Sequence, residues 1–137
     1  TKQLAESLTV EHLMPTKWID AWPMVDGYKP TQQEFLSVAF SAAENDSVSG
    51  RIVRRNRLKD SFGNLTLLTQ PLNSVVSNGP YEAKRQAIGE HSLLVMNREW
   101  VKQERWDEEA ILDRGAKLFD YAMQIWPLPA VRAPTGA

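Results

Sequence analysis

The chain has no cysteine, so neither a disulfide nor a zinc site built on thiolates can hold its fold together. Its 137 residues are enough for one domain with a substantial hydrophobic core. Five tryptophans, four phenylalanines and three tyrosines supply the large side chains that such a core needs. The fold must therefore be held by apolar packing, and we expect the tryptophans to serve the core rather than to stack on bases.

Charge gives a mixed indication about partners. The net charge is −1 and the isoelectric point is about 6.1, whereas a dedicated nucleic-acid binder is usually basic. The net charge therefore argues against strong DNA binding by this chain alone, but the distribution of charge matters more than the net charge. Positive charge gathers at residues 51–59, and acidic residues gather elsewhere, notably at 107–109. No apolar run approaches the roughly 20 residues that a membrane helix needs, and no signal peptide is visible.

Local patterns predict short strands among several helices. Alternation and a Leu/Thr run predict strands at 8–13 and 65–68. Helices are predicted from the Thr31 capping box to about residue 43, at 71–77, at 81–88 before Gly89, at 92–101, and from the Asp107 cap to Pro127. Residues 14–30, 45–50 and 60–63 are predicted to be loops or turns, and the basic segment 51–59 is given no particular element. The fold class is therefore α+β, with one domain at 1–127 and a disordered tail at 128–137.

Helical spacing also indicates which side chains face the core. The expected core-facing residues are Phe35, Leu36, Ala39 and Phe40 in the first helix, Val75 and Val76 in the second, and Ile111, Leu118, Ala122, Ile125 and Trp126 in the last.

One arrangement of polar residues points to chemistry. Glu11 and His12 are adjacent, Asn64 follows Gly63 at the start of the second strand, and Asn73 comes nine residues after Asn64. Each has an ordinary structural explanation: a lone histidine is more often structural than catalytic, and asparagine is common in turns and at helix ends. Their order and spacing nevertheless predict a one-metal nuclease. Neighbours in a strand point to opposite faces, so Glu11 and His12 serve one site only if the strand ends or bulges there.

The residue types suit that chemistry. Histidine ordinarily titrates at about pH 6.5, so His12 can take a proton from water at neutral pH. A carboxylate such as Glu11 and the amide oxygen of Asn73 suit a hard cation such as Mg²⁺ or Mn²⁺. Positively charged residues near these positions would hold a nucleic-acid backbone, although such a run is usually just a solvated surface. The candidate DNA-binding residues are Arg51, Arg54, Arg55, Arg57, Lys59, Lys84 and Arg85.

These residues also carry a family resemblance. Glu11–Pro15, Gly63–Leu68, Asn73, Asn78 and Lys84 resemble the HNH, or ββα-metal, nuclease superfamily. The closer resemblance is to the C-terminal nuclease domain of GmrSD-type, modification-dependent restriction proteins, including SspE-like relatives. It spans about residues 8–127, while the specific motifs cover about 8–15 and 63–84. It implies a compact ββα-metal motif surrounded by several α-helices.

The resemblance implies a role for each residue. His12 would be the general base, and Glu11 would be a ligand of one Mg²⁺ or Mn²⁺. Asn64, grouped with His12 as a catalytic-site residue, would brace the turn between the strands. Asn73 would be the second metal ligand, at a position where many relatives have histidine. The implied activity is a metal-dependent, nicking DNA endonuclease of a prokaryotic defence system.

The same resemblance sets the expected partners. They are DNA and an N-terminal domain of the same polypeptide, because the chain is expected to be a C-terminal fragment of a larger protein in the prokaryotic cytoplasm, away from any membrane. Two alternatives stay open. One is a DNA-binding module without catalysis, and the other is a regulatory domain that is active only with its N-terminal sensor and NTPase domain.

Overall fold

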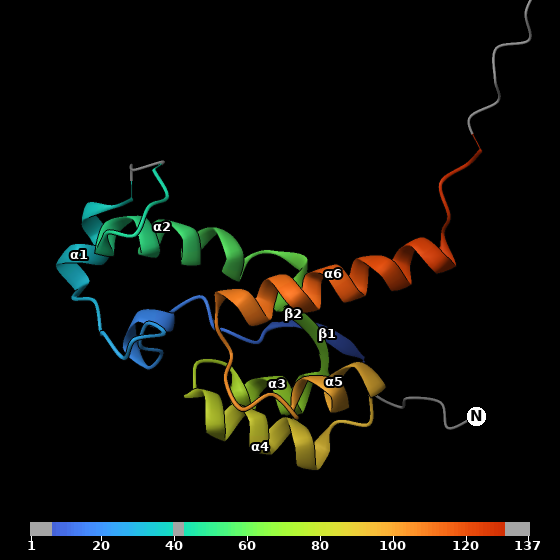
Figure 1. Cartoon of the computed structure of the whole chain (residues 1–137). Helices are drawn as coiled ribbons and strands as arrows, with labels where there is room; N and C mark the ends of the chain where they lie inside the picture. The colour runs from blue at the N-terminus through green and yellow to red at the C-terminus, as the bar shows by residue number, and fades with distance from the viewer. Residues whose placement is uncertain (1–6, 40–42, 131–137) are drawn as a thin grey trace, which may run out of the picture.

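The computed structural model describes residues 7–39 and 43–130 (Figure 1). Within these ranges the elements are β1 (Leu8–His12), α1 (Gln32–Ser37), α2 (Val48–Lys59), β2 (Leu65–Thr69), α3 (Gln70–Val76), α4 (Tyr81–His91), α5 (Val95–Trp100) and α6 (Glu108–Ile125), with short 3-10 helices η1 (Trp18–Asp20) and η2 (Phe62–Asn64). The predicted α+β class is confirmed. In this part of the chain, no helix is long and apolar enough to span a membrane.

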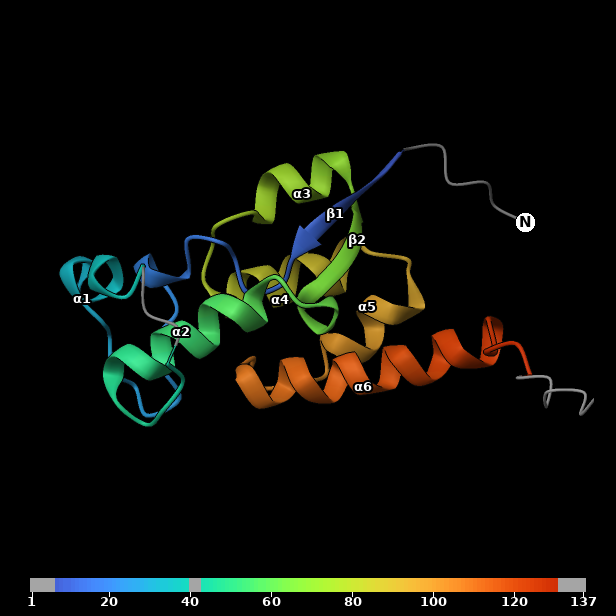
Figure 2. The ribbon, with the colours of Figure 1, turned by 90° about the horizontal axis from the view of Figure 1, so that it is seen from above.

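The two strands form one antiparallel pair, with Leu8 opposite Thr69 and His12 opposite Leu65. Both predicted strands are confirmed to within one residue. Side chains alternate between the two faces of the pair. On one face Thr66 and Leu68 are buried, whereas Val10 on the other face is 59% exposed. Helix α3 follows β2 directly and packs beside both strands (Figure 2). The order β1, β2, α3 places residues 9–13, 63–68 and 71–77 in one unit.

Local capping signals predicted two helix starts correctly. Thr31 and Glu34 form the full capping box at α1, and the Asp107 side chain accepts from the Ala110 backbone at α6. Helix α1 ends at Ser37, earlier than predicted. Its Leu36 is 66% exposed, so that core prediction is wrong. Residues 40–42, and with them the prediction for Phe40, lie outside the described residues.

The basic segment, for which the sequence predicts no particular element, is helix α2, which begins at the Ser47 cap. Two further predictions needed correction. Helix α4 continues through Gly89 to His91, because a glycine with ordinary helical backbone angles weakens a helix without having to end it. Val75, predicted to face the core, is 79% exposed, while Val76 beside it is 4% exposed.

Helix α6 crosses close to the turn between α2 and β2 (Figure 1). Gly63 in that turn lies so near the helix that an added Cβ would fall 1.9 Å from the Ile111 carbonyl oxygen. Only glycine allows this approach. The first half of α6 is therefore held tightly, and Ile111 is 1% exposed. The predicted apolar stripe is wrong at its far end, because Ile125 and Trp126 lie beyond the elements on which α6 packs and are largely exposed.

The core is rich in tryptophan, as expected. Trp18, Trp22, Trp100 and Trp106 are buried, and Trp126 is not. A chain of edge-on aromatic contacts joins Trp22, Tyr81, Trp100 and Trp106, with ring centroids 5.4–5.9 Å apart. This aromatic row ties α4 and α5 to the loops that carry Trp22 and Trp106.

Candidate active site

His12 is the last residue of β1, and a carboxylate meets it there. Its Nε2 lies 3.1 Å from Oδ1 of Asp60, the residue that ends α2. The His12 side chain is 30% exposed, so solvent reaches the ring. A hydrogen bond from Lys59 lowers the pKa of Asp60 most strongly, and the bond with His12 lowers it further. Asp60 is therefore ionised at neutral pH and can fix the orientation of the His12 ring.

Asn64 braces the chain immediately after His12. Its amide oxygen accepts from Met14 N at 2.8 Å and from the Trp106 indole at 2.9 Å. Its amide nitrogen donates to Met14 O at 2.8 Å and to Lys59 O at 2.7 Å. The side chain is fully buried, and these four bonds use its hydrogen-bonding capacity. Asn64 thus holds the end of β1 against the end of α2, next to Asp60.

Arg114 of α6 supports the same turn from the other side. Its Nη1 donates to Gly63 O at 2.8 Å and to Leu65 O at 2.7 Å. Burial lowers the pKa of Arg114 to about 10, so the guanidinium remains charged at neutral pH. Together with the close approach of Gly63 to α6, these bonds fix the turn that carries Asn64.

Glu11 is only 8% exposed, and a buried lysine holds it. Lys84 of α4 donates from Nζ to Glu11 Oε1 at 2.7 Å, and to the carbonyl oxygens of His12 and Ser77 at 2.8 Å each. Burial lowers the pKa of Lys84, and the contact with Glu11 opposes that shift. Lys84 thus ties α4 to the strand at the very residues predicted to be functional.

Asn73 also reaches β1. Its Nδ2 donates to Thr9 Oγ1 at 2.9 Å. Thr9 and Glu11 are two residues apart in a strand, so they share a face. The structure therefore brings Asn73 and Glu11 to one face of β1 and places His12 at the end of the strand on the opposite face. Among described residues, His12 makes no hydrogen bond with either of them.

The donor atoms can be tested against a hard divalent cation. Glu11 Oε2 and Asn73 Oδ1 accept no hydrogen bond from any described residue. Carboxylate and amide oxygens suit Mg²⁺, which usually keeps several waters and needs few protein ligands. Over residues 7–39 and 43–130, no group of three or more His, Cys, Asp or Glu side chains forms a denser site. Glu11 and Asn73 thus have the donor types that such a cation prefers.

The predicted DNA-binding set needs correction. Arg55 and Lys84 are each 1% exposed and lie in buried ion pairs, so neither reaches a DNA phosphate. The other members are at least partly exposed, and each also pairs with a carboxylate. These pairs are Arg51–Asp26, Arg54–Glu109, Arg57–Glu44, Lys59–Asp60 and Arg85–Glu82.

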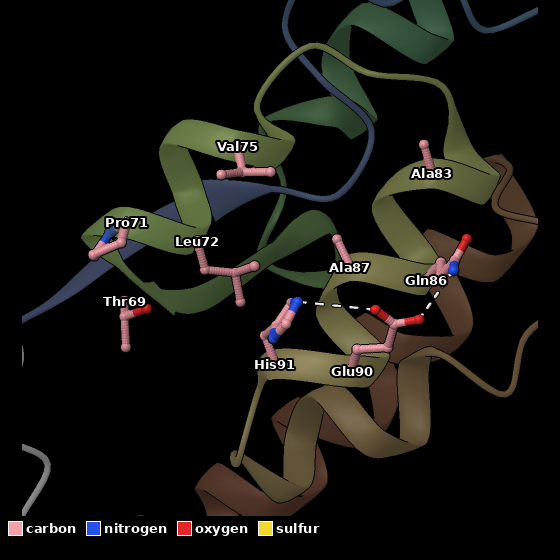
Figure 3. Close-up of a pocket in the computed structure, with 9 residues that line it drawn as sticks. All are labelled: Thr69, Pro71, Leu72, Val75, Ala83, Gln86, Ala87, Glu90 and His91. Carbon is pink, nitrogen blue, oxygen red and sulfur yellow. Dashed lines mark hydrogen bonds and ion pairs between the residues drawn. The ribbon is translucent and has the colours of Figure 1, made fainter.

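A surface groove lies between α3 and α4 (Figure 3). Its volume is about 490 Å³, and Pro71, Leu72 and Val75 form much of the α3 wall. On the α4 side His91 lies 3.9 Å from Glu90, as the dashed line in Figure 3 marks. None of the predicted catalytic or metal-binding residues lines this groove.

The sequence patterns do not predict the structural roles of three residues of the site. They predict a turn at Asp60 and a DNA contact at Lys84, and they indicate no role for Arg114. Asp60 meets His12 across 48 positions and Lys84 meets Glu11 across 73, distances over which a local pattern carries no signal. The basic run beside Asp60 gave no indication that α2 would deliver a carboxylate to the histidine.

A small α+β domain with a solvent-exposed histidine–carboxylate pair, next to oxygen atoms suited to a cation, has the features of a hydrolase. The comparison with known proteins narrows the class. The family described as GmrSD restriction endonucleases, C-terminal domain, matches residues 1–121. The chain belongs to this family, and it is therefore a restriction endonuclease domain. No curated protein and no solved structure gave a match.

Proposed function

We propose that this domain is a metal-dependent DNA endonuclease that nicks one strand, with His12 as the general base. The observation that carries the proposal is the His12–Asp60 pair at the solvent-exposed end of β1. An imidazole that donates its Nε2 hydrogen to Asp60 keeps a lone pair on Nδ1. That lone pair would accept the proton of the attacking water. The family gives independent support for a nuclease.

In the proposed reaction the water oxygen attacks phosphorus, the bond from phosphorus to the leaving 3′-oxygen breaks, and that oxygen takes a proton from solvent. The water proton passes to His12 Nδ1, while Asp60 stabilises the charged ring through Nε2. By family analogy the products are a 5′-phosphate and a 3′-hydroxyl. A divalent cation bound by Glu11 and Asn73 would neutralise charge on the phosphate and the leaving oxygen. Asn64 acts indirectly, because it holds in place the strand end that carries His12.

The free edge of β1 is where a phosphodiester would approach Glu11 and His12. In the described sheet β1 pairs only with β2, so the other edge of β1 carries no strand. Glu11 and His12 are adjacent near the end of the strand. A phosphate at the end of β1 would contact His12 on one side and Glu11 on the other. Two neighbouring residues that point to opposite faces would in this way serve one site.

Five surface cations remain candidates for phosphate contact. They are Arg51, Arg54, Arg57, Lys59 and Arg85. Exposed ion pairs contribute little stability, so a phosphate can displace the carboxylate partner at small cost. The Arg57 and Arg54 side chains are 66% and 41% exposed, which makes them the most accessible of the α2 group.

The same ion pairs favour a second proposal, that DNA recruitment depends on another part of the protein. With these five cations paired and a net charge of −1, the predicted DNA-binding residues present little free positive charge. We therefore propose that an N-terminal domain brings the nuclease to DNA. The isolated domain would then cleave slowly and need a high protein concentration.

The test is relaxation of supercoiled plasmid in Mg²⁺, Mn²⁺ or EDTA, by the wild type, His12→Ala and His91→Ala. His91 is the only other histidine in the chain and is the matched control. We expect open circles in metal with the wild type and with His91→Ala. Loss of the general base should slow the reaction by roughly 10²–10⁴-fold. Nicking by His12→Ala at the wild-type rate would refute the assignment.

A further inference from the structure

Helix α6 carries more apolar surface than the described part of the domain covers. Its last turns extend beyond the strand pair and beyond α5 (Figure 1 and Figure 2). Phe119 and Trp126 are 60% and 73% exposed, and Leu112, nearer the start of the helix, is 44% exposed. A helix of a water-soluble domain normally buries its apolar face against another element. The face that carries these three side chains has no such partner among the described residues.

The spacing of this face is that of a contact between two helices. Leu112, Phe119 and Trp126 follow one another at intervals of seven residues, and Ala116 and Met123 lie four residues after the first two. Trp126 continues the row, because its N–H still bonds a carbonyl oxygen of the last helical turn. A repeat of four and three residues is the seam along which one helix of a coiled coil packs against another. We call these five residues the α6 seam.

The α6 seam lies on the side of the helix that faces away from α5. Arg114, Leu118 and Tyr121 line the space between α6 and α5. Each of them comes two residues after a member of the seam, which is about half a turn of an α-helix. A second helix can therefore pack on the seam without displacing α5 from the domain.

Charge beside the α6 seam indicates which helix fits it. One flank of the seam is polar and exposed, and consists of Asp113, Lys117, Asp120 and Gln124. If two copies of α6 lie antiparallel about a two-fold axis at Phe119, Lys117 of each copy lies opposite Asp120 of the other. In a parallel pair this flank would instead face the small residues of the other flank, Gly115 and Ala122. Flanking charges of opposite sign set the orientation of helix pairs, so α6 is complementary to an antiparallel copy of itself.

Side-chain sizes match in the same antiparallel arrangement. Leu112 of one copy lies opposite the large ring of Trp126 of the other, and Phe119 meets its own copy at the axis. The small Ala116 lies opposite the long side chain of Met123. Large side chains that face smaller ones fill a helix–helix contact without voids. The half of α6 that projects from one copy is thereby covered by the half that the domain holds in the other copy.

We propose that two copies of this domain associate through the α6 seam, as an antiparallel pair of α6 helices about a two-fold axis at Phe119. Two-fold dimers of identical chains are the commonest soluble assemblies. A contact through one short helix is smaller than the roughly 800 Å² per partner of a standard interface, so we expect a dissociation constant of about 10 μM. One consequence rests on the proposed function: a dimer supplies one nicking site for each DNA strand.

Sedimentation equilibrium of the wild-type protein tests the association. We expect the mass of a dimer at about 100 μM and that of a monomer at about 1 μM. Phe119→Asp places two negative charges at the axis and should remain a monomer at the higher concentration. Leu36→Asp makes the same kind of change at a similarly exposed position of α1, and should dimerise as the wild type does. A wild type that is monomeric at both concentrations, or a Phe119→Asp protein that dimerises equally well, would overturn the proposal.

Single cysteines test the orientation, because the chain has no cysteine of its own. Leu112→Cys and Trp126→Cys proteins are mixed and oxidised. An antiparallel pair brings these two positions together, so the mixed disulfide should exceed its share from random pairing. Disulfides mainly between like variants, or in the proportions of random pairing, would overturn the antiparallel arrangement.

These two measurements need neither cleavage nor metal, so failure of the proposed nuclease activity would leave their results unaffected. With an active nuclease, the products from supercoiled plasmid test the consequence for cleavage. At protein concentrations that favour the dimer, the wild type should give more linear DNA than Phe119→Asp, whereas both should give open circles. Equal yields of linear DNA from the two proteins would overturn this consequence.

Discussion

Among the described residues two ion pairs are buried, and they bind their carboxylates differently. Arg55 grips Glu108 with two nitrogens, Nε to Oε1 at 2.5 Å and Nη2 to Oε2 at 3.2 Å. Lys84 holds Glu11 through Oε1 alone, at 2.7 Å. Glu11 Oε2 is left without a hydrogen bond from any described residue. One carboxylate is fully used by the fold, and the other keeps an oxygen available.

The difference shows which buried charge marks a candidate site. The planar fork of arginine matches both oxygens of a carboxylate, whereas the lysine ammonium is a point charge. Arg55 also bonds the carbonyl oxygens of Trp22 and Pro23, which completes a purely structural anchor between α2, α6 and the loop before α1. Lys84 instead bonds the backbone of His12. The pair with the uncommitted oxygen is the pair that adjoins the proposed base.

The largest predicted effect is on stability, from Arg55→Met. Removing the arginine leaves Glu108 buried without its partner, and the free energy of unfolding should fall by about 3–5 kcal/mol. Urea unfolding measures the loss. The double variant Arg55→Met, Glu108→Leu removes both charges and should recover most of it. A single variant as stable as the wild type would show that the pair is not the anchor described above.

Lys84→Met should lower the free energy of unfolding in EDTA by about 3 kcal/mol, because Glu11 loses its partner. The variants of the two buried pairs should differ in their response to Mn²⁺. Mn²⁺ should restore part of the stability of Lys84→Met by binding the released carboxylate, and should not restore Arg55→Met. Urea unfolding with Mn²⁺ and with EDTA makes the comparison. Equal responses of both variants to Mn²⁺ would remove the distinction between the two carboxylates.

Asp60→Asn should slow nicking by roughly tenfold at neutral pH, because the His12 ring loses a charged partner that orients it and stabilises its protonated form. Single-turnover plasmid nicking gives the rate. Asp26→Asn is the matched control, since Asp26 also pairs with a cation of α2 but does not touch His12. An equal rate loss in both variants would assign Asp60 only a general charge effect.

The smallest predicted effect is on acid stability. The pKa of Asp60 is lowered in the folded state, so its contribution to stability is present above its ordinary value of 3.8 and is lost as the pH falls through the folded-state value. Between about pH 6 and about pH 3 the wild type should lose more unfolding free energy than Asp60→Asn. Urea unfolding at the two pH values measures both losses. Identical losses would show that the Asp60 contacts contribute nothing to folding.

The strands and caps of this fold could be predicted because their signals are local. The capping box at Thr31 and the cap at Asp107 lie within three residues of their partners. Helix α2 was missed because its buried face includes Arg55 beside Ile52 and Leu58, so the apolar pattern is interrupted by a charge. Burial of that arginine depends on Glu108, 53 residues away, which no local pattern contains.

The candidate site likewise has residues that could be predicted from the sequence and residues that could not. The motif residues Glu11, His12, Asn64 and Asn73 could be named from their order in the chain and from the family resemblance. Their partners could not, because Asp60 and Lys84 come from helices whose packing sets the contact. Lys84 was assigned to DNA as an ordinary surface lysine would be, and only its burial shows that it holds Glu11.

The central claim is that Glu11 offers an oxygen to a catalytic cation and Glu108 does not. The direct measurement is the rate of plasmid nicking against Mn²⁺ concentration for the wild type, Glu11→Gln and Glu108→Gln, each checked for folding by circular dichroism. We predict a saturable Mn²⁺ dependence for the wild type and for Glu108→Gln, and no metal-dependent nicking for Glu11→Gln. A Glu11→Gln protein that nicks with the wild-type rate and Mn²⁺ dependence would contradict the claim.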